Sequence, residues 1–187
     1  MSINAREAIL LAARNIAQSQ GYNGLNFRDL AQAVGIKPAS IYYHFPSKAD
    51  LGIAVARRYW QDGAAALETL SEETPDPAEA LRRFPEIFRR SLEAGNRLCL
   101  ASFVGAETDN LPTAMAEEIQ AFAQVNTDWL RRQLVAANCC EATDSDVRAR
   151  AIFSAVAGAQ LIARSRSDIT LFDTLIEAYR AYGPLPA

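Results

Sequence analysis

The sequence predicts an all-α protein. Apolar residues recur at intervals of three and four along most of the 187 residues, and no segment alternates in the β-branched pattern of a strand. Half of the residues are hydrophobic and 22% are charged, a composition that provides a buried core and argues against intrinsic disorder. A chain of this length holds one or two domains.

The first predicted helix has recognisable ends. Asn4 is expected to cap its start, and Gly21 is expected to end it because glycine readily adopts a positive φ. Ile9, Ala13 and Ile16 recur at three and four and are expected to form its buried stripe.

Two short helices are predicted next, joined by a tight glycine turn. Asn26 is placed to cap a helix over about 28–34, and Gly35 is placed to break it. Pro38 suits the first position of the following helix, which we expect to run to His44 or Phe45. The spacing of these elements over 26–45 is that of a helix-turn-helix.

Helices are also predicted along the rest of the chain. Ser47, with Asp50 three residues later, is expected to cap a long fourth helix that runs towards Leu70. The segment 72–77 combines prolines with acidic residues and is expected to be a loop. Further helices are expected over about 77–94, 98–107, 112–137, 143–166 and 171–181.

Composition excludes several classes of protein. His44 is the only histidine, so a multi-histidine metal site is excluded. We expect that the protein is not an enzyme and that it binds no metal or cofactor. Cys99 and the adjacent Cys139 and Cys140 fit neither zinc spacing nor a paired disulfide framework, which favours a reducing cytoplasm. We see no export signal at the N-terminus and no apolar stretch of the roughly 20 residues that cross a membrane, so we expect a cytoplasmic protein without membrane contact.

The third helix is predicted to present a donor-rich face. No carboxylate lies in it or in the turn before it, as a surface facing phosphates requires. Lys48 follows at the first turn of the next helix, where free N–H groups favour an anion. The residues expected on or near the outward part of the third helix are Lys37, Ala39, Ser40, Tyr42, Tyr43 and His44.

Charge is segregated along the chain. The total is −3, which by itself does not indicate a polyanion-binding protein. Through Trp60, however, seven basic and three acidic residues give +4, and the remainder carries −7. Both lysines of the protein, Lys37 and Lys48, fall in the basic part, so the N-terminal region is predicted to bind nucleic acid.

The string GIKPASIYYHF over 35–45, followed by Ser47, Lys48 and Leu51, resembles the DNA-binding domain of the TetR/AcrR family of bacterial transcriptional regulators. The resemblance covers about the first third of the chain, and the remainder is similar only in length and helical layout. It implies a homodimer that places paired recognition helices in successive major grooves of an operator. It also implies a C-terminal pocket whose small-molecule ligand releases the DNA.

The resemblance assigns roles to individual residues and domains. It implies a DNA-binding domain over 1–60 and an effector-binding and dimerisation domain over 61–187. Many members of the family carry a polar residue at the position of Pro38. The proline at this position reduces hydrogen bonding to bases. Phosphate contacts are implied for Ser40, Tyr43, His44 and Lys48, and base contacts for Arg28, Lys37, Ala39 and Tyr42.

The C-terminal part yields candidates for the pocket and the dimer interface. The segment from Ala151 to Ala163 is apolar on almost every face, so we expect it to be enclosed in a core or, preferably, across a subunit interface. Glu117 and Glu118 are expected to be solvated surface residues. Candidate pocket residues are Phe103, Glu107, Phe122, Asn126, Trp129 and Gln160.

The resulting hypothesis is a repressor that a small molecule releases from DNA. One alternative keeps the DNA-binding part and replaces the ligand by oxidation or alkylation of Cys99 or of Cys139 and Cys140. Cys99 by itself is expected to be a buried small hydrophobe. The other alternative is a helical adaptor or enzyme that uses a helix-turn-helix without touching DNA.

Overall fold

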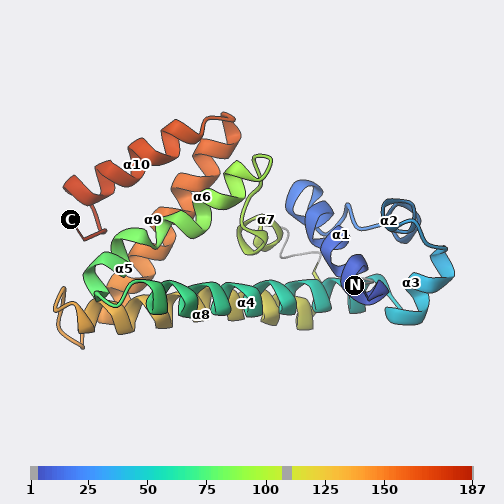
Figure 1. The fold of residues 1–187 in the computed structure, drawn as a ribbon, viewed down its shortest axis with the longest axis horizontal. Helices are drawn as coiled ribbons and strands as arrows, with labels where there is room; N and C mark the ends of the chain where they lie inside the picture. The colour runs from blue at the N-terminus through green and yellow to red at the C-terminus, as the bar shows by residue number, and fades with distance from the viewer. Residues whose placement is uncertain (1–3, 107–110, 187) are drawn as a thin grey trace. The chain divides into compact units, whose positions relative to one another are not determined.

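The structure, a computed structural model, describes residues 4–106 and 111–186, and these residues form helices without any strand. Figure 1 shows the helices along the chain. Their bounds are α1 Ala5–Gln20, α2 Phe27–Val34, α3 Pro38–His44, α4 Lys48–Glu73, α5 Pro77–Arg83, α6 Pro85–Glu93, α7 Leu100–Gly105, α8 Thr113–Ala136, α9 Ser145–Ser165 and α10 Ile169–Tyr182. The predicted all-α class is confirmed.

The chain divides into two compact units. The first unit comprises Met1–Gln61 and Leu100–Phe122, and the second unit comprises Asp62–Cys99 and Ala123–Ala187. The first unit therefore includes residues 100–122, which the sequence-based division places in the C-terminal domain over 61–187. The two predicted domains are defined by function, DNA binding and effector binding, and this functional division stays a prediction.

The core of the first unit is built around α1. Ile9 and Ala13 are fully buried, as expected, but Ile16 is only half-buried, and Leu10 and Ala17 complete the stripe instead. Residue 16 also fits the spacing of three and four, but residues 10 and 17 shift the centre of the buried stripe away from it, so Ile16 lies at the edge of the stripe. The stripe faces neighbouring helices, since α1 packs on α2, α3 and α7.

Close packing at Gly52 joins α4 to two parts of the first unit. A Cβ atom placed on Gly52 would lie 2.8 Å from Met115 Sδ on α8 and 2.8 Å from Tyr22 Cε2. Met115 is fully buried and Tyr22 is 8% exposed, so neither side chain has free space into which to move. The glycine is required here for a close approach and not for a special backbone conformation.

Gly52→Ala is expected to lower the free energy of unfolding by about 1–3 kcal/mol, because overpacking outweighs the better helix propensity of alanine. Gly105→Ala is the matched control, since within 4–106 and 111–186 its Cβ would meet only Ile119 Cγ2, at an ordinary 3.8 Å. Denaturant unfolding of both variants measures the difference. Equal stability of Gly52→Ala and the wild type would contradict the close packing.

The second unit contains the C-terminal helices. α9 packs on α6 and α10, and α10 also packs on α6 (Figure 1). The predicted helix over 77–94 is wrong, because α5 ends at Arg83 and α6 begins at Pro85. A proline inside a helix lacks the N–H that the preceding turn requires, whereas at the first helical position its absence costs nothing.

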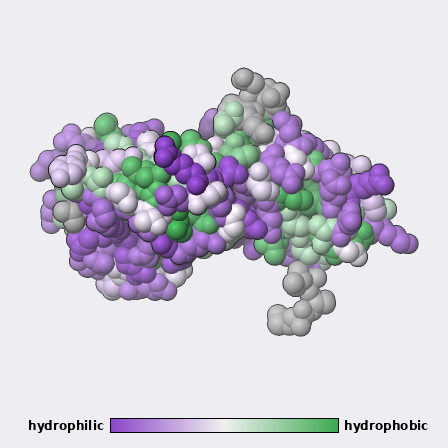
Figure 2. All heavy atoms as spheres, turned by 90° about the horizontal axis from the view of Figure 1, so that it is seen from above, coloured by the Kyte–Doolittle hydropathy of each residue, from purple (hydrophilic) through white to green (hydrophobic). Residues whose placement is uncertain are grey.

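Hydrophobic side chains reach the surface of the second unit. Figure 2, a view from above Figure 1, shows hydrophobic atoms among hydrophilic ones over the helices of this unit. On α9, Leu161 and Ile162 are each about half exposed, and Tyr182 at the end of α10 is 94% exposed. The segment from Ala151 to Ala163 is therefore not enclosed within a single chain. No helix of the described ranges is both long and apolar enough to span a bilayer.

Candidate nucleic-acid interface

The helix-turn-helix is set by local capping. The side-chain oxygen of Asn26 accepts hydrogen bonds from the backbone N–H groups of Arg28 (2.8 Å) and Asp29 (3.4 Å), which fixes the start of α2. Gly35 ends α2 in the left-handed conformation, with φ 75° and ψ 32°. Pro38 occupies the start of α3, where its missing N–H costs nothing. These three predictions are confirmed.

The start of α4 is capped as the sequence predicts. Ser47 Oγ accepts a hydrogen bond from the backbone N–H of Asp50 (3.1 Å) and donates one to its carboxylate (2.6 Å). The cap places Lys48 on the first turn, where its Nζ donates to the backbone oxygen of Asn23 (3.2 Å) and lies 4.7 Å from the centre of the Tyr22 ring. Lys48 therefore has a defined position beside the loop that precedes α2.

Helix α3 separates a buried side from an exposed side. Ile41 is fully buried and Phe45, directly after the helix, is 2% exposed, so these residues hold α3 on the unit. Tyr43 is 85% exposed and Tyr42 is 57% exposed, which is unusual for large aromatic side chains. Lys37, Pro38 and Ala39 are also exposed, whereas Ser40 and His44 are half-buried.

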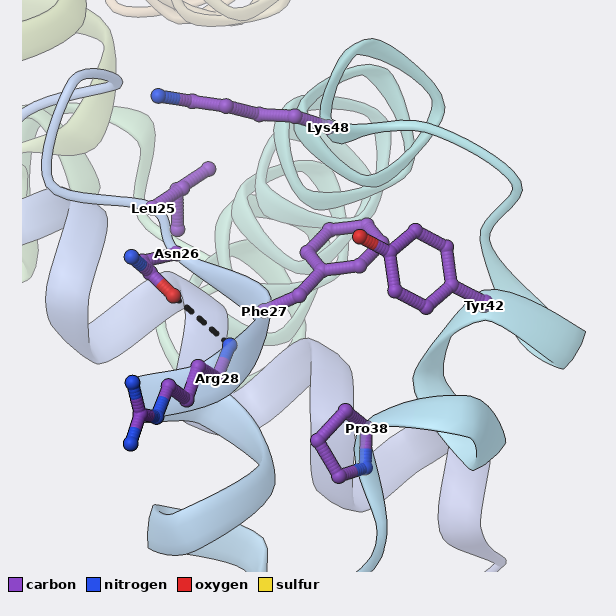
Figure 3. A pocket seen from close by; sticks show the side chains of 7 residues that line it. All are labelled: Leu25, Asn26, Phe27, Arg28, Pro38, Tyr42 and Lys48. Atoms are coloured by element: carbon purple, nitrogen blue, oxygen red, sulfur yellow. Dashed lines mark hydrogen bonds between the residues drawn. The ribbon is translucent and has the colours of Figure 1, made fainter.

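A pocket lies where α2, α3 and the start of α4 meet (Figure 3). Its volume is about 540 Å³. The Tyr42 ring points from α3 towards the Phe27 ring, with centroids 4.8 Å apart and planes at 62°. Figure 3 shows the Arg28 and Lys48 side chains extending away from these rings. The residues that line the pocket are Leu25, Asn26, Phe27, Arg28, Pro38, Tyr42 and Lys48.

Several cations of the first unit are engaged in internal contacts. Arg57 on α4 pairs with Glu118 on α8 (2.6 Å), and Arg58 pairs with Glu7 on α1 (2.6 Å). The guanidinium groups of Arg6 and Arg14 lie over the rings of Phe45 and Tyr59, at 5.3 and 4.7 Å. The net +4 through Trp60 therefore overstates the charge that faces solvent freely.

Arg28 and Lys37 differ from these cations. Within residues 4–106 and 111–186, neither side chain makes an ion pair, a hydrogen bond or a ring contact. Arg28 lies at the start of α2 and Lys37 directly precedes α3, so both flank the exposed side of α3. Together with Lys48 they concentrate positive charge at one edge of the unit.

Glu118 is not the solvated residue that the sequence predicts. Only 14% of its side chain is exposed, and it accepts hydrogen bonds from Arg57 Nε (2.8 Å), Arg57 Nη2 (2.6 Å) and Trp60 Nε1 (2.6 Å). Burial raises the pKa of the Glu118 carboxyl, but the hydrogen bonds and the charge of Arg57 outweigh it, so this pKa lies below its ordinary value. Glu118 thereby ties α4 to α8. The sequence carries no local signal for a contact between residues so far apart.

The predicted ligand residues are divided between the two units. Phe103 and Phe122 belong to the first unit, whereas Asn126, Trp129 and Gln160 belong to the second. Phe103 is half-buried, and the other four are buried. Glu107, the sixth candidate, lies outside the described residues.

Buried polar groups of the second unit have partners. Gln160 accepts a hydrogen bond from the backbone N–H of Cys99 (3.0 Å) and donates one to the backbone oxygen of Phe88 (2.7 Å). Trp129 donates to Ser71 Oγ (2.9 Å) and stacks on Phe84, with centroids 5.7 Å apart. A ligand that uses these groups has to displace existing hydrogen bonds.

The cysteines occupy two environments. Cys99 is 2% exposed, so its prediction as a buried small hydrophobe is confirmed, whereas Cys139 and Cys140 follow α8 and are half-buried. Among the described residues, no group of three or more His, Cys, Asp or Glu side chains is arranged to hold a metal ion.

Comparison with known protein families agrees with this arrangement. Residues 9–55 match the family model described as bacterial regulatory proteins, tetR family. The repressor AcnR of Corynebacterium efficiens is 39% identical over 70 residues, which are 37% of this chain and 36% of AcnR. The regulator RutR of Escherichia coli is 30% identical over 104 residues, 54% of this chain and 49% of RutR. The match thus spans only about a third to a half of these curated relatives.

Solved structures match over nearly the whole chain. A TetR transcriptional regulator from Legionella pneumophila has 32% sequence identity and a TM-score of 0.90, covering 97% of this chain and 98% of that one. A TetR-family regulator from Agrobacterium tumefaciens has 28% identity and a TM-score of 0.86, covering 93% and 94%.

Fold and site together define a helix-turn-helix protein with a helical C-terminal part. The similarity to the Legionella regulator extends this definition to both units. The chain belongs to the TetR family of bacterial regulatory proteins.

Proposed function

We propose that the protein is a transcriptional repressor that binds a palindromic DNA operator as a dimer and is released by a small molecule. The observation that carries this proposal is the exposed side of α3, which presents two uncovered tyrosines and no carboxylate beside three cations. The cations of this surface suit the negatively charged phosphates of DNA. Its tyrosines suit the base edges of the major groove, which carry both hydrogen-bonding and apolar groups.

The contacts to DNA divide into two sets. Lys48, Tyr43, Ser40 and His44 contact phosphates, which position the protein without reading sequence. Arg28, Lys37, Ala39 and Tyr42 contact base edges in the major groove. The absence of side-chain partners for Arg28 and Lys37 in the described part of the chain supports this assignment, because their donors are free to bind DNA.

Dimerisation is proposed through α9 and α10 of the second unit. Ala151, Ser154, Leu161 and Ile162 are exposed along one side of α9, and Gly158 lies among them. Among the residues that the structure describes, a Cβ atom on Gly158 would meet nothing within 4 Å, so these residues leave this side of α9 open. An exposed stripe that is apolar apart from Ser154 and has a small residue at its middle suits close approach by a second copy.

Release by a small molecule is proposed to act through the second unit, where Phe84, Phe88, Trp129 and Phe153 form an aromatic cluster. The ligand has to bind the DNA-free state more tightly than the DNA-bound state, since equal affinities would shift nothing. We prefer this trigger to modification of Cys99, because Cys99 is buried; oxidation or alkylation of the half-buried Cys139 and Cys140 is the alternative trigger.

Lys48→Ala is the first test of DNA binding. Removing the Lys48 ammonium leaves one phosphate without its cation, so binding to every DNA sequence is expected to weaken. The slope of log K against log salt is expected to become shallower by about 0.9 for each phosphate that is no longer neutralised. Fluorescence anisotropy with operator and random duplexes over a range of salt concentrations measures both effects.

Arg131→Ala on α8 is the matched control, because it removes one positive charge from a side chain that pairs only with Asp128 among the described residues. It is expected to leave the slope unchanged. Because Lys48 also bonds Asn23, thermal unfolding verifies that Lys48→Ala remains folded. An unchanged slope for a folded Lys48→Ala protein would contradict the assignment.

A further inference from the structure

The second unit carries a pocket of its own, between the second half of α4 and the helices α5 and α6. Its volume is about 280 Å³, close to the smallest of the roughly 300–1,000 Å³ pockets that hold small molecules. The aromatic cluster of the second unit does not line this pocket, so the pocket is a separate site. The residues that line it are Ala66, Thr69, Leu70, Glu73, Arg83, Glu86, Ile87 and Arg90.

The pocket is a groove between two helix faces. Its lining residues on α4, and likewise those on α6, follow one another at helical intervals, so each set shares one face of its helix. Leu70 is 5% exposed, and Ala66 and Ile87 are half-buried. These three side chains form the apolar part of the lining.

Arg83 is already neutralised within the pocket. Its Nε lies 3.4 Å from Glu86 Oε1, and its Nη2 lies 3.9 Å from Glu73 Oε2. Its Nη1 donates a hydrogen bond to Thr74 Oγ1. The charge and the donors of this guanidinium are therefore used inside the protein, and they are not the groups that a ligand would bind.

Arg90 also lines the pocket and differs from Arg83. Glu86 pairs with Arg83 and not with Arg90, although a glutamate followed by an arginine four positions later is a favourable spacing on a helix. Within 4–106 and 111–186, neither the Arg90 guanidinium nor the Thr69 hydroxyl makes an ion pair, a hydrogen bond or a ring contact. Both residues are exposed, so their N–H and O–H groups are available to an acceptor on a ligand.

These groups define the chemistry of a matching ligand. A planar guanidinium binds a carboxylate through two parallel hydrogen bonds, and the apolar lining favours a hydrocarbon part. Two arginines and two glutamates line the pocket, so the charges of the lining cancel. A second negative charge on the ligand would be repelled by Glu73 and Glu86, which favours an anion with a single charge.

We infer that this pocket binds a small monocarboxylate, whose carboxylate group contacts Arg90 and Thr69 and whose hydrocarbon part packs on Leu70 and Ile87. The site lies outside the aromatic cluster through which release from DNA is proposed. The inference goes beyond the proposed function and does not depend on it, because it involves neither DNA nor a second copy of the chain.

Three probes with the same carbon chain test the inference on the full-length protein by isothermal titration calorimetry. Hexanoate carries one carboxylate, hexanamide carries none, and adipate carries two. Hexanoate is expected to bind about tenfold more tightly than hexanamide, since a charge-assisted hydrogen bond is replaced by a neutral one. Adipate is expected to bind more weakly than hexanoate, because its second carboxylate is repelled.

Variants assign the binding to the pocket. Arg90→Gln is expected to lower the affinity for hexanoate about tenfold and to leave the affinity for hexanamide unchanged. Ile87→Ser is expected to lower the affinity for both probes by a similar factor, because both use the apolar lining. Arg131→Gln is the matched control, since Arg131 on α8 does not line the pocket, and it is expected to change neither affinity.

Several results would overturn the inference. One is the absence of hexanoate binding at millimolar concentrations, and another is binding that Arg90→Gln leaves unchanged. Equal weakening by Arg90→Gln and Arg131→Gln would show a general attraction of anions in place of a site. Equal affinities for hexanoate and adipate would contradict selection of a single charge. Operator binding by Arg90→Gln is expected to equal that of the wild type, so these outcomes leave the proposed function intact.

Discussion

Replacing Leu161 and Ile162 together by arginine is expected to make the protein monomeric and to lower its affinity for a two-half-site operator by about 10²–10⁴-fold. The side chains are 50% and 48% exposed in the single chain, so arginine fits there without disturbing the fold. In a dimer the same positions would bury unpaired charges. The large effect on DNA arises because the second half-site is no longer bound in an intramolecular step.

Val135→Arg provides the control for this variant. Val135 lies on α8, is 40% exposed and is also apolar, but it is outside the stripe on α9. This protein is expected to remain dimeric and to bind the operator normally. Light scattering after size-exclusion chromatography measures the oligomeric state, and a dimeric Leu161→Arg/Ile162→Arg protein would contradict the proposed interface.

Arg28→Ala and Lys37→Ala are each expected to lower operator affinity by about 5- to 150-fold, the range for removal of a good base contact. Binding to random DNA should fall much less, since the contacts of Lys48 and Tyr43 to phosphates remain. Both side chains lack a partner in the described residues, so neither substitution removes an internal contact.

The ratio of operator to random-DNA affinity at fixed salt is the quantity to measure for these two variants. Arg131→Ala again serves as the control for removal of one charge. If Arg28→Ala and Lys37→Ala reduce binding to both duplexes equally, the two residues contact phosphates and the assignment to bases is wrong.

Local signals explain how much of the helix-turn-helix was predictable. Asn26, Gly35, Pro38 and Ser47 each act within a few residues of their own position, and each begins or ends a helix as expected. Pro85 carried an equally local signal for the end of a helix. The prediction of a continuous helix over 77–94 failed because it did not use that signal.

Contacts between distant residues explain what was not predictable. Glu118 pairs with Arg57 and Trp60 across about 60 positions, and nothing in the neighbouring residues distinguishes it from a solvated carboxylate. The contact of Phe27 with Tyr42 depends on how α2 crosses α3, which the periodicity of either helix does not specify. For the same reason, the net charge of +4 through Trp60 overstates the positive charge that is available to DNA, because a sum over the sequence does not show which cations are paired within the protein.

Footprinting of the purified protein on DNA upstream of its own gene tests the central claim most directly. At low salt the account predicts protection of a pseudo-palindrome whose half-site centres lie about 34–36 Å apart, or a multiple of that spacing. Addition of the right metabolite should remove the protection. Absence of any protected palindrome, with the protein folded and at low salt, would contradict the account.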